Sequence, residues 1–469
     1  MAIGRREFIA GAAGLVLAGA ADPPGALTPE AFGARGDGRT NDTDAFAALS
    51  RAINSAGGGT VVLRPVTYVV GKQLAPTAGP LGFAFTPSPV LRFVGCRYPV
   101  AVRGNGAVLR AAPGLRFGSF DPRSGAPIER GKRFYDRGYR ASPYEAMISA
   151  ERCSGGVAIA DVELDGNLQA LAIGGHWGDI DWQLPGTGVL LTDNDGPETI
   201  ERVHSHHHPL DGIMINGPSE RASSSSISDV RCDSNGRQGC SVVGGRNYVF
   251  QRCRFEQSGK GGLSSSPGAG VDIEAEEKTV RNLRFSACEF VDNSGPGLSA
   301  PAGDSEGATF DSCTFVGTTN WSAWPDKPGF RFSDCLFVGA MVHAHGDPDP
   351  EKAAHFANCR FRDDPALSPT GVVFGNSGEG KPIVDLYDGR NARFDQCDFQ
   401  LGEAGLLPWS IREVIYSNCT MAQRSPLLSH PRGTFLGTNR IDGHADLSGS
   451  LVDGTLVLNG RTVPPGPIA

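Results

Sequence analysis

Phe310-Asp-Ser-Cys313-Thr-Phe315 is one copy of a short pattern that recurs through the second half of the chain. Each copy has an aromatic residue, two variable residues, Cys, one variable residue and an apolar residue. The cysteines of the copies stand at positions 253, 288, 313, 335, 359, 397 and 419. That spacing is typical of one supersecondary unit per repeat, with loops inserted into the longer repeats. Because Cys and Phe are often buried, the pattern predicts a column of side chains inside a solenoid.

A second repeat, anchored by Gly, precedes and overlaps the first. Its copies are residues 188–191, 212–215, 239–242, 270–273 and 297–300. Strand alternation predicts that one set points inward: Val189, Ile213, Cys240, Val271 and Leu298. It predicts that the other set points outward: Leu190, Met214, Ser241, Asp272 and Ser299. No amphipathic helical segment separates these runs, so the repeats predict an all-β, single-stranded parallel β-helix.

The two ends of the solenoid need caps, because open ends expose strand edges. Residues 42–55 predict a short capping helix, with apolar residues at helical spacing between an Asn41 or Asp42 N-cap and three glycines at 57–59. We place the N-terminal cap at about residues 28–60. Residues 451–458 predict the last strands before a Pro-rich tail, within a C-terminal part of about 438–469. The mature chain is therefore expected to be one domain, residues 22–469.

The N-terminus resembles a twin-arginine export signal. Arg5 and Arg6 precede an uncharged stretch that ends in a small-x-small sequence, Ala18-Gly19-Ala20. This predicts a signal peptide at residues 1–21 and a periplasmic or secreted bacterial protein. The apolar stretch is too short to cross a bilayer of about 30 Å, and no later segment is long enough. The protein is therefore expected to have no membrane span.

Charge and cysteine content restrict the partners and the redox state. The net charge of −8 argues against a nucleic-acid partner, since phosphate binding depends on clustered Lys and Arg. The eleven cysteines are an odd number, and the twin-arginine route carries proteins folded in a reducing cytosol. We therefore expect the cysteine column to be mostly reduced. The sequence does not indicate an oligomeric state.

The segment Ala31-Phe-Gly-Ala-Arg-Gly-Asp37-Gly, followed by Asn41-Asp-Thr-Asp44 and the predicted helix, resembles the opening of the pectate lyase-like superfamily. Residues 161–167 also look like a coil of that group. The superfamily contains polygalacturonases, polysaccharide lyases and phage tailspike depolymerases. The resemblance implies a right-handed parallel β-helix that acts on a polysaccharide, but it does not specify the reaction.

Aligning the Gly-anchored strands brings polar residues together. Asp211 and Gln238 share one column, Arg237 lies one step earlier, and Asp272 and Glu274 share the outward face of one strand. By strand spacing Asp211 and Asp272 lie roughly 9–10 Å apart, near the upper end of the separation in inverting glycosidases. Neighbouring carboxylates repel each other unless a cation, a proton or Arg offsets the charge. We predict Asp211, Arg237, Asp272 and Glu274 as catalytic residues and Gln238 as a substrate ligand.

Four histidines, His204, His206, His207 and His208, precede Asp211. Consecutive strand residues point to opposite faces, which argues against metal binding by this run. His208 is predicted as a catalytic base or a hydrogen-bond donor to substrate, with a turn histidine as the alternative.

Two insertions add candidate substrate-binding residues. Residues 117–144 combine arginines with aromatic residues, including Arg133, Arg137 and Tyr139. Arg side chains bind carboxylates as a fork, so this loop suits an anionic polysaccharide; a solvated loop or an oligomer contact is the alternative. Trp177 and Trp182 in the next insertion supply flat apolar faces.

The resemblance to polysaccharide lyases implies β-elimination on a uronic-acid polymer, with Arg237 or His208 as base. Asp272 and Glu274, with Asp211, would then bind calcium or orient that base. The resemblance to polygalacturonases implies hydrolysis instead, although the paired-Asp and Gly-His-Gly motifs of that family are absent. A C5-epimerase and a non-catalytic polysaccharide-binding protein also remain open. The latter is suggested by the combination of residues 235–239 with 270–274, which resembles β-helix proteins described only by fold.

Overall fold

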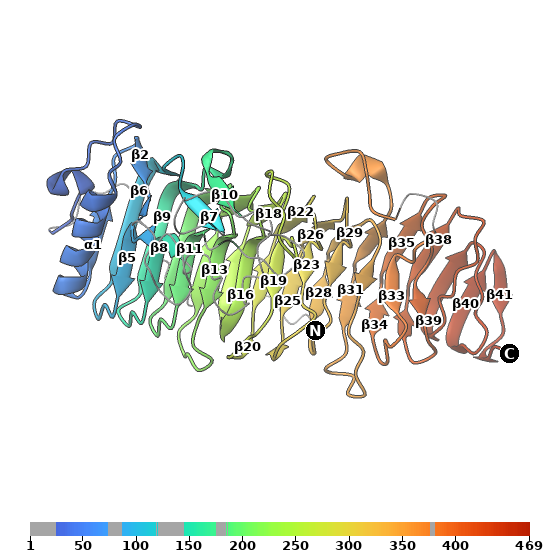
Figure 1. Cartoon of the computed structure of the whole chain (residues 1–469). Helices are drawn as coiled ribbons and strands as arrows, with labels where there is room; N and C mark the ends of the chain where they lie inside the picture. The colour runs from blue at the N-terminus through green and yellow to red at the C-terminus, as the bar shows by residue number, and fades with distance from the viewer. Residues whose placement is uncertain are drawn as a thin grey trace, which may run out of the picture.

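The computed structural model describes residues 25–73, 87–118, 120, 145–174, 184, 186–375 and 380–469. The predicted signal peptide lies outside these residues, as do five predicted substrate ligands: Arg133, Arg137, Tyr139, Trp177 and Trp182. The chain forms a single-stranded right-handed parallel β-helix, with α1 (Thr43–Ala56) at one end and the C-terminus at the other (Figure 1). This confirms the fold predicted from the repeats.

Two long sheets run along the solenoid. The thirteen-strand sheet contains β5 (Leu91–Val94), β8 (Glu145–Glu151), β11 (Gly186–Thr192), β13 (Asp211–Asn216), β16 (Gln238–Arg246), β19 (Val271–Ile273), β20 (Val280–Arg281), β23 (Leu298–Ser299), β24 (Ser305–Glu306), β27 (Ala323–Trp324), β30 (Val342–His343), β33 (Val384–Leu386) and β36 (Trp409–Ser410). Two short pairs stand apart: β3 (Lys72–Gln73) with β4 (Pro87–Ser88), and β7 (Arg116–Gly118) with β10 (Ala172–Gly174).

The twenty-five-strand sheet bends around a corner of the solenoid. Its strands are β1 (Gly59–Val62), β2 (Thr67–Val70), β6 (Val100–Ala111), β9 (Val157–Asp165), β12 (Glu198–His206), β14 (Ser225–Ser228), β15 (Arg231–Asp233), β17 (Tyr248–Gln251), β18 (Arg254–Glu256), β21 (Arg284–Ser286), β22 (Glu289–Val291), β25 (Thr309–Asp311), β26 (Thr314–Val316), β28 (Arg331–Ser333), β29 (Leu336–Val338), β31 (His355–Ala357), β32 (Arg360–Arg362), β34 (Arg393–Asp395), β35 (Asp398–Leu401), β37 (Ile415–Ser417), β38 (Thr420–Gln423), β39 (Thr434–Asp442), β40 (Leu451–Leu458), β41 (Arg461–Val463) and β42 (Gly466–Pro467). The long strand β12 pairs with β14 before the corner and with β15 after it.

The Phe-x-x-Cys spacing is explained by this corner. The residue before each repeat cysteine has a positive φ, for example 56° at Asp334 and 54° at Asn358. A left-handed residue breaks strand alternation, so Phe332 and Cys335 both face the interior although they are three residues apart. Asn and Asp tolerate this conformation better than most residues, which accounts for their presence at several corners.

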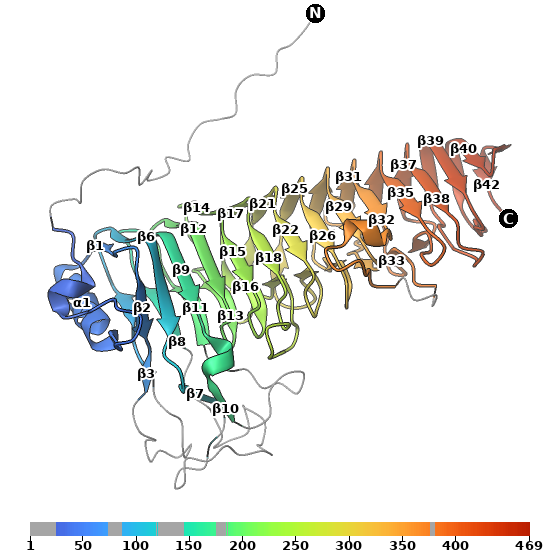
Figure 2. The same ribbon diagram turned by 90° about the horizontal axis from the view of Figure 1, so that it is seen from above.

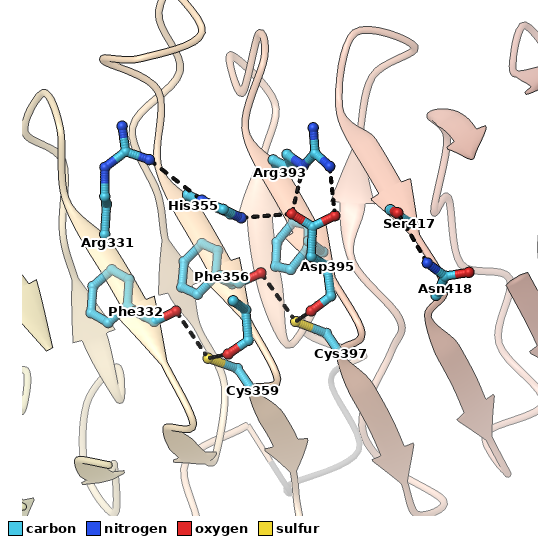
Figure 3. A network of polar contacts seen from close by, with 12 residues as sticks. Arg331, Phe332, His355, Phe356, Cys359, Arg393, Asp395, Cys397, Ser417 and Asn418 are labelled. Carbon is cyan, nitrogen blue, oxygen red and sulfur yellow. Dashed lines mark hydrogen bonds and ion pairs between the residues drawn. The ribbon is translucent and has the colours of Figure 1, made fainter. Parts of the chain in front are cut away.

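Inside the corner, rings and thiols form two ladders (Figure 3). The rings of Phe332 and Phe356 stack with centroids 4.8 Å apart, and the next pair, Phe356 and Phe394, is 4.9 Å apart. The Cys359 thiol donates to the Phe332 carbonyl of the preceding coil at 3.6 Å. All eleven cysteines are buried with free thiols, and the mostly reduced state of the column stays a prediction.

The N-terminal cap agrees with its prediction. Ala45, Phe46, Leu49 and Ile53 are buried against the first coils, and Gly57, with a φ of 76°, caps the C-terminal end of α1. The Asn41 side chain accepts a hydrogen bond from the Thr43 amide at 3.1 Å. None of the helices among the described residues has the length and apolarity needed to cross a bilayer.

The C-terminal tail differs from its prediction. Instead of trailing after β40, it folds back as β41 and β42, and both pair antiparallel with β40. These short strands occupy the hydrogen-bonding edge that the last coil would otherwise expose. The reversal depends on contacts with β40, which the local Pro-rich composition does not reveal.

Candidate active site

The thirteen-strand sheet carries a row of outward-pointing side chains, one per coil. Its register aligns Met214 with Ser241, Ser241 with Asp272, and Asp272 with Ser299. The predicted inward set of this sheet, Val189, Ile213, Cys240, Val271 and Leu298, is fully buried, so the predicted alternation is confirmed. Ser241, Asp272 and Ser299 are buried too, although they lie on the outer face. A closed polar cluster therefore occupies the middle of this face.

Asp211 and Arg237 form a buried, two-pronged ion pair. The guanidinium donates from Nε and Nη2 to the two carboxylate oxygens at 2.8 and 2.6 Å. The Ser241 hydroxyl donates to Asp211 Oδ2, also at 2.6 Å. Asp211 has no exposed surface, so its carboxylate cannot reach a substrate. Paired in this way, Arg237 remains a cation, and the prediction that it acts as a base is not supported.

Asp272 is the titratable group of the cluster. Gln238 Nε2 donates to Oδ2 at 2.6 Å, while Oδ1 is buried without a hydrogen-bond partner. Burial, followed by the neighbouring charge of Glu274, raises the pKa of Asp272 to about 7, although the charge of Arg237 and the nearby Ser299 hydroxyl partly offset this. A carboxyl group with that pKa exchanges protons near neutral pH.

Glu274 follows β19 on the same outer face and is half-buried. Calcium usually takes six to eight oxygen ligands, so Asp272 and Glu274 would need further donors. Within the described ranges, no third carboxylate or imidazole gathers with this pair into a metal-binding group. One Asp272 oxygen is already bound by Gln238. Asp272 and Glu274 therefore fit a calcium ion poorly. The chemical role that suits Asp272 better is proton exchange.

His208 lies away from this cluster. Its Nε2 is 3.1 Å from the carbonyl oxygen of Leu164, which lies one coil back, opposite Ser205 in the twenty-five-strand sheet. Burial, followed by the charge of His206, lowers the pKa of His208 to about 3, and only 2% of the residue is exposed. It borders an apolar pocket with Phe117 and Met147. His208 is therefore a buried neutral histidine, and its predicted role as a base is not supported.

The outward row continues beyond the residues found from the sequence. The register places Trp324 beside Ser299, Asp385 beside His343, and Trp409 beside Asp385. Trp324 and His343 were not predicted from the sequence, because Ser322 and Met341 replace the anchoring glycine in their coils. The remaining signal in these two coils was one apolar strand residue, Ala323 or Val342, followed directly by Trp or His. We call the series Met214, Ser241, Asp272, Ser299, Trp324, His343, Asp385 and Trp409 the outer row.

The C-terminal half of the outer row offers flat faces and charged groups together. The Trp321 and Trp324 ring centroids are 4.8 Å apart, and His343 Nδ1 lies 3.5 Å from an Asp385 carboxylate oxygen. Trp409 is 50% exposed, with the exposed Tyr387 ring beside it. Exposed aromatic faces next to hydrogen-bonding groups are suited to sugar rings, which have apolar faces and hydroxyl edges.

Comparison with known proteins agrees with the fold. The family model described as the right-handed beta helix region matches residues 179–361. The N-terminal fragment of gene product 12 from bacteriophage phi29 superposes with a TM-score of 0.50 at 14% identity, covering 94% of this chain and 73% of that one. The chain thus has the fold of the right-handed parallel β-helix proteins.

Two further proteins are similar to the chain. Depolymerase 1, capsule KN3-specific, of Klebsiella phage KN3-1 is 24% identical over 358 residues, which is 67% of this chain. The chain spans only 40% of the length of that relative. The A-module of the mannuronan C-5 epimerase AlgE4 from Azotobacter vinelandii is 17% identical, with a TM-score of 0.43, and the match covers 90% of this chain and all of the module.

Proposed function

We propose that the protein is an exported enzyme that degrades an acidic, uronic-acid-containing polysaccharide by β-elimination. The observation that carries the proposal is Asp272, a buried carboxyl group with a pKa of about 7 and one unpartnered oxygen on the outer row. The similarity to a capsule depolymerase supports a polysaccharide substrate. Export through the twin-arginine route, to the periplasm or the exterior, belongs to the same proposal.

In this mechanism a small rotation brings the unpartnered oxygen of Asp272, a residue that is 5% exposed, to the surface of the outer row. There it removes the C5 proton of a bound uronate. The buried Asp211 carboxylate holds the Arg237 guanidinium in place, and that cation stabilises the negative charge that develops on the substrate carboxylate. The C4–O bond then breaks, a C4–C5 double bond forms, and the leaving oxygen takes a proton from solvent or from Asp272. A base with a pKa near the working pH suits this transfer.

Hydrolysis is the second candidate, and the Asp272–Glu274 pair favours it specifically. Asp272 is buried and Glu274 is half-buried, so the two carboxyl groups lie in different environments. In glycosidases, such a difference lets one carboxyl group act as the general acid while the other is ionised. Asp272 would then protonate the leaving oxygen while Glu274 activates water. Epimerisation shares the first proton abstraction with elimination, and binding without cleavage needs neither group.

The test is incubation of the mature protein with acidic and neutral polysaccharides, with and without calcium, while ultraviolet absorbance and reducing ends are recorded together. A rise in both supports elimination, and dependence on calcium would restore the metal prediction at Asp272 and Glu274. Reducing ends without absorbance would replace the lyase with the hydrolase. If neither signal rises on any polymer, cleavage is excluded, and C5 proton exchange into deuterated water distinguishes an epimerase from a binding protein.

Trp409→Ala tests whether substrate lies along the outer row. Loss of one stacking face is expected to cost roughly 0.5–1.5 kcal/mol of binding, which is a rise in KM of about 2- to 10-fold with little change in kcat. Because half of Trp409 is exposed, the melting temperature should hardly change. Tyr98→Ala, which removes an exposed aromatic ring near the N-terminal cap, is the matched control. Equal KM values for the two variants would place the substrate elsewhere.

A further inference from the structure

A cluster of imidazoles and carboxylates lies on the outer face of the twenty-five-strand sheet, away from the outer row. It is built by three neighbouring strands, β9, β12 and β15, which lie side by side in Figure 2. The register places His204 beside Glu163, and His206 between Asp165 and Asp233. Three successive coils therefore bring their polar side chains to one spot.

His207 joins this cluster because the backbone turns there. Its φ is 54°, so strand alternation ends at His206 and the His207 side chain stays on the same side. The Nδ1 atoms of His206 and His207 are 2.7 Å apart, and the His204 and His206 ring centroids are 4.3 Å apart. The expected strand alternation therefore fails at His206 and His207, whereas His208 is directed elsewhere, toward the Leu164 carbonyl group.

The donor atoms converge as metal ligands do. Potential ligand atoms of His206, His207 and Asp233 all lie within 4.8 Å of one another. Two Nδ1 atoms at 2.7 Å cannot both carry a proton, so at least one presents a lone pair. A tetrahedral ion bound at about 2.0–2.1 Å holds two nitrogens roughly 3.3 Å apart, so only a small ring movement is needed.

The surroundings of the cluster supply more donors. His204 Nε2 lies 3.1 Å from Asp233 Oδ1 and would orient that carboxylate. Asp165 Oδ1, at 3.9 Å from His206 Nδ1, is placed for the fourth position if water does not take it.

We propose that His206, His207 and Asp233 bind one zinc-class transition-metal ion. Imidazole nitrogen with carboxylate oxygen is a donor set that such ions prefer, whereas calcium and magnesium prefer oxygen alone. The ion would cross-link two coils on a sheet that takes no part in the proposed catalysis. Its role is therefore structural, and the proposal stands independently of the polysaccharide substrate.

The test is calorimetric titration of the chelator-treated mature protein with zinc at pH 7.5, together with melting curves. We expect one ion per chain, a Kd of about 1 μM or tighter, and a higher melting temperature with zinc. His206→Gln should weaken binding by at least about 100-fold, while its metal-free melting curve should match that of the unsubstituted protein. Binding should also weaken as the pH falls below about 6, because protonated imidazoles do not bind metal.

His355→Gln is the matched control. His355 lies on the same sheet and is 2.7 Å from an Asp395 oxygen, but among the described residues it belongs to no group of three metal ligands (Figure 3). If His206→Gln fails to fold, Asp233→Asn takes its place and should also weaken zinc binding. The proposal is overturned if no stoichiometric zinc binding is found, or if the cluster variants bind zinc as tightly as His355→Gln does.

Discussion

Asp272→Asn is expected to reduce polysaccharide cleavage by about 10²- to 10⁴-fold, the usual contribution of a positioned acid or base. Asn is nearly isosteric and still accepts the hydrogen bond from Gln238, so the variant should fold. The pH profile of the unsubstituted protein identifies the role of the group. If Asp272 is the base of an elimination, kcat/KM rises with pH through about 7; if it is the acid of a hydrolysis, kcat/KM falls there.

Asp272→Asn should lower activity but raise the stability of the folded protein at high pH. The pKa of Asp272 is raised in the folded protein, so its contribution to stability is fully present below the ordinary carboxyl value of about 4 and is lost as pH rises through about 7. Asn has no proton to lose. At pH 8 Asp272→Asn should therefore be more stable than the unsubstituted protein by roughly 1–3 kcal/mol, and the difference should vanish or reverse near pH 4.

Activity assays and melting curves from pH 4 to 8 check both effects. Asp304→Asn, which changes an exposed carboxylate paired with Arg281, is the control and should alter neither activity nor the pH dependence of melting. Retention of cleavage by Asp272→Asn would remove this residue from the mechanism. Parallel melting curves for Asp272→Asn and the unsubstituted protein would show that the carboxyl group titrates normally.

Arg237→Met is expected to destabilise the protein by about 3–5 kcal/mol, because it leaves the fully buried Asp211 carboxylate without its cation. Asp211→Asn removes that charge and should recover part of the loss when it is combined with Arg237→Met. Urea unfolding of both single variants and the double variant measures the coupling between the two side chains. Additive losses would show that the ion pair contributes nothing specific.

Arg237→Lys separates the catalytic role from the structural one. Lys keeps the charge but cannot reproduce the two parallel hydrogen bonds to Asp211, so we expect a smaller loss of stability than for Met. Cleavage should still fall strongly if the guanidinium must be held in place for the substrate carboxylate. Full activity in Arg237→Lys would limit this ion pair to a structural role.

The sequence by itself determined the solenoid, because its information is local and repeated. Each repeat contains a buried aromatic residue, a corner and a buried thiol, so every repeat predicts the same conformation. Coils of the same conformation then stack on one another along the solenoid axis. The capping helix was also predictable from apolar spacing and three glycines. The alignment of Asp211 with Gln238 followed from the anchoring glycine and is confirmed by the strand register.

The chemistry of the site was decided only by the tertiary structure. Three features depend on contacts with neighbouring coils, 26 to 44 residues away in sequence. They are the hydrogen bond from Gln238 to Asp272, the ion pair of Asp211 with Arg237, and the contact of His208 with the Leu164 carbonyl group. Period-two alternation also fails at residues with positive φ. His207 itself has a positive φ, and its side chain therefore lies on the same face as that of His206 instead of the opposite face. This places two consecutive imidazoles together.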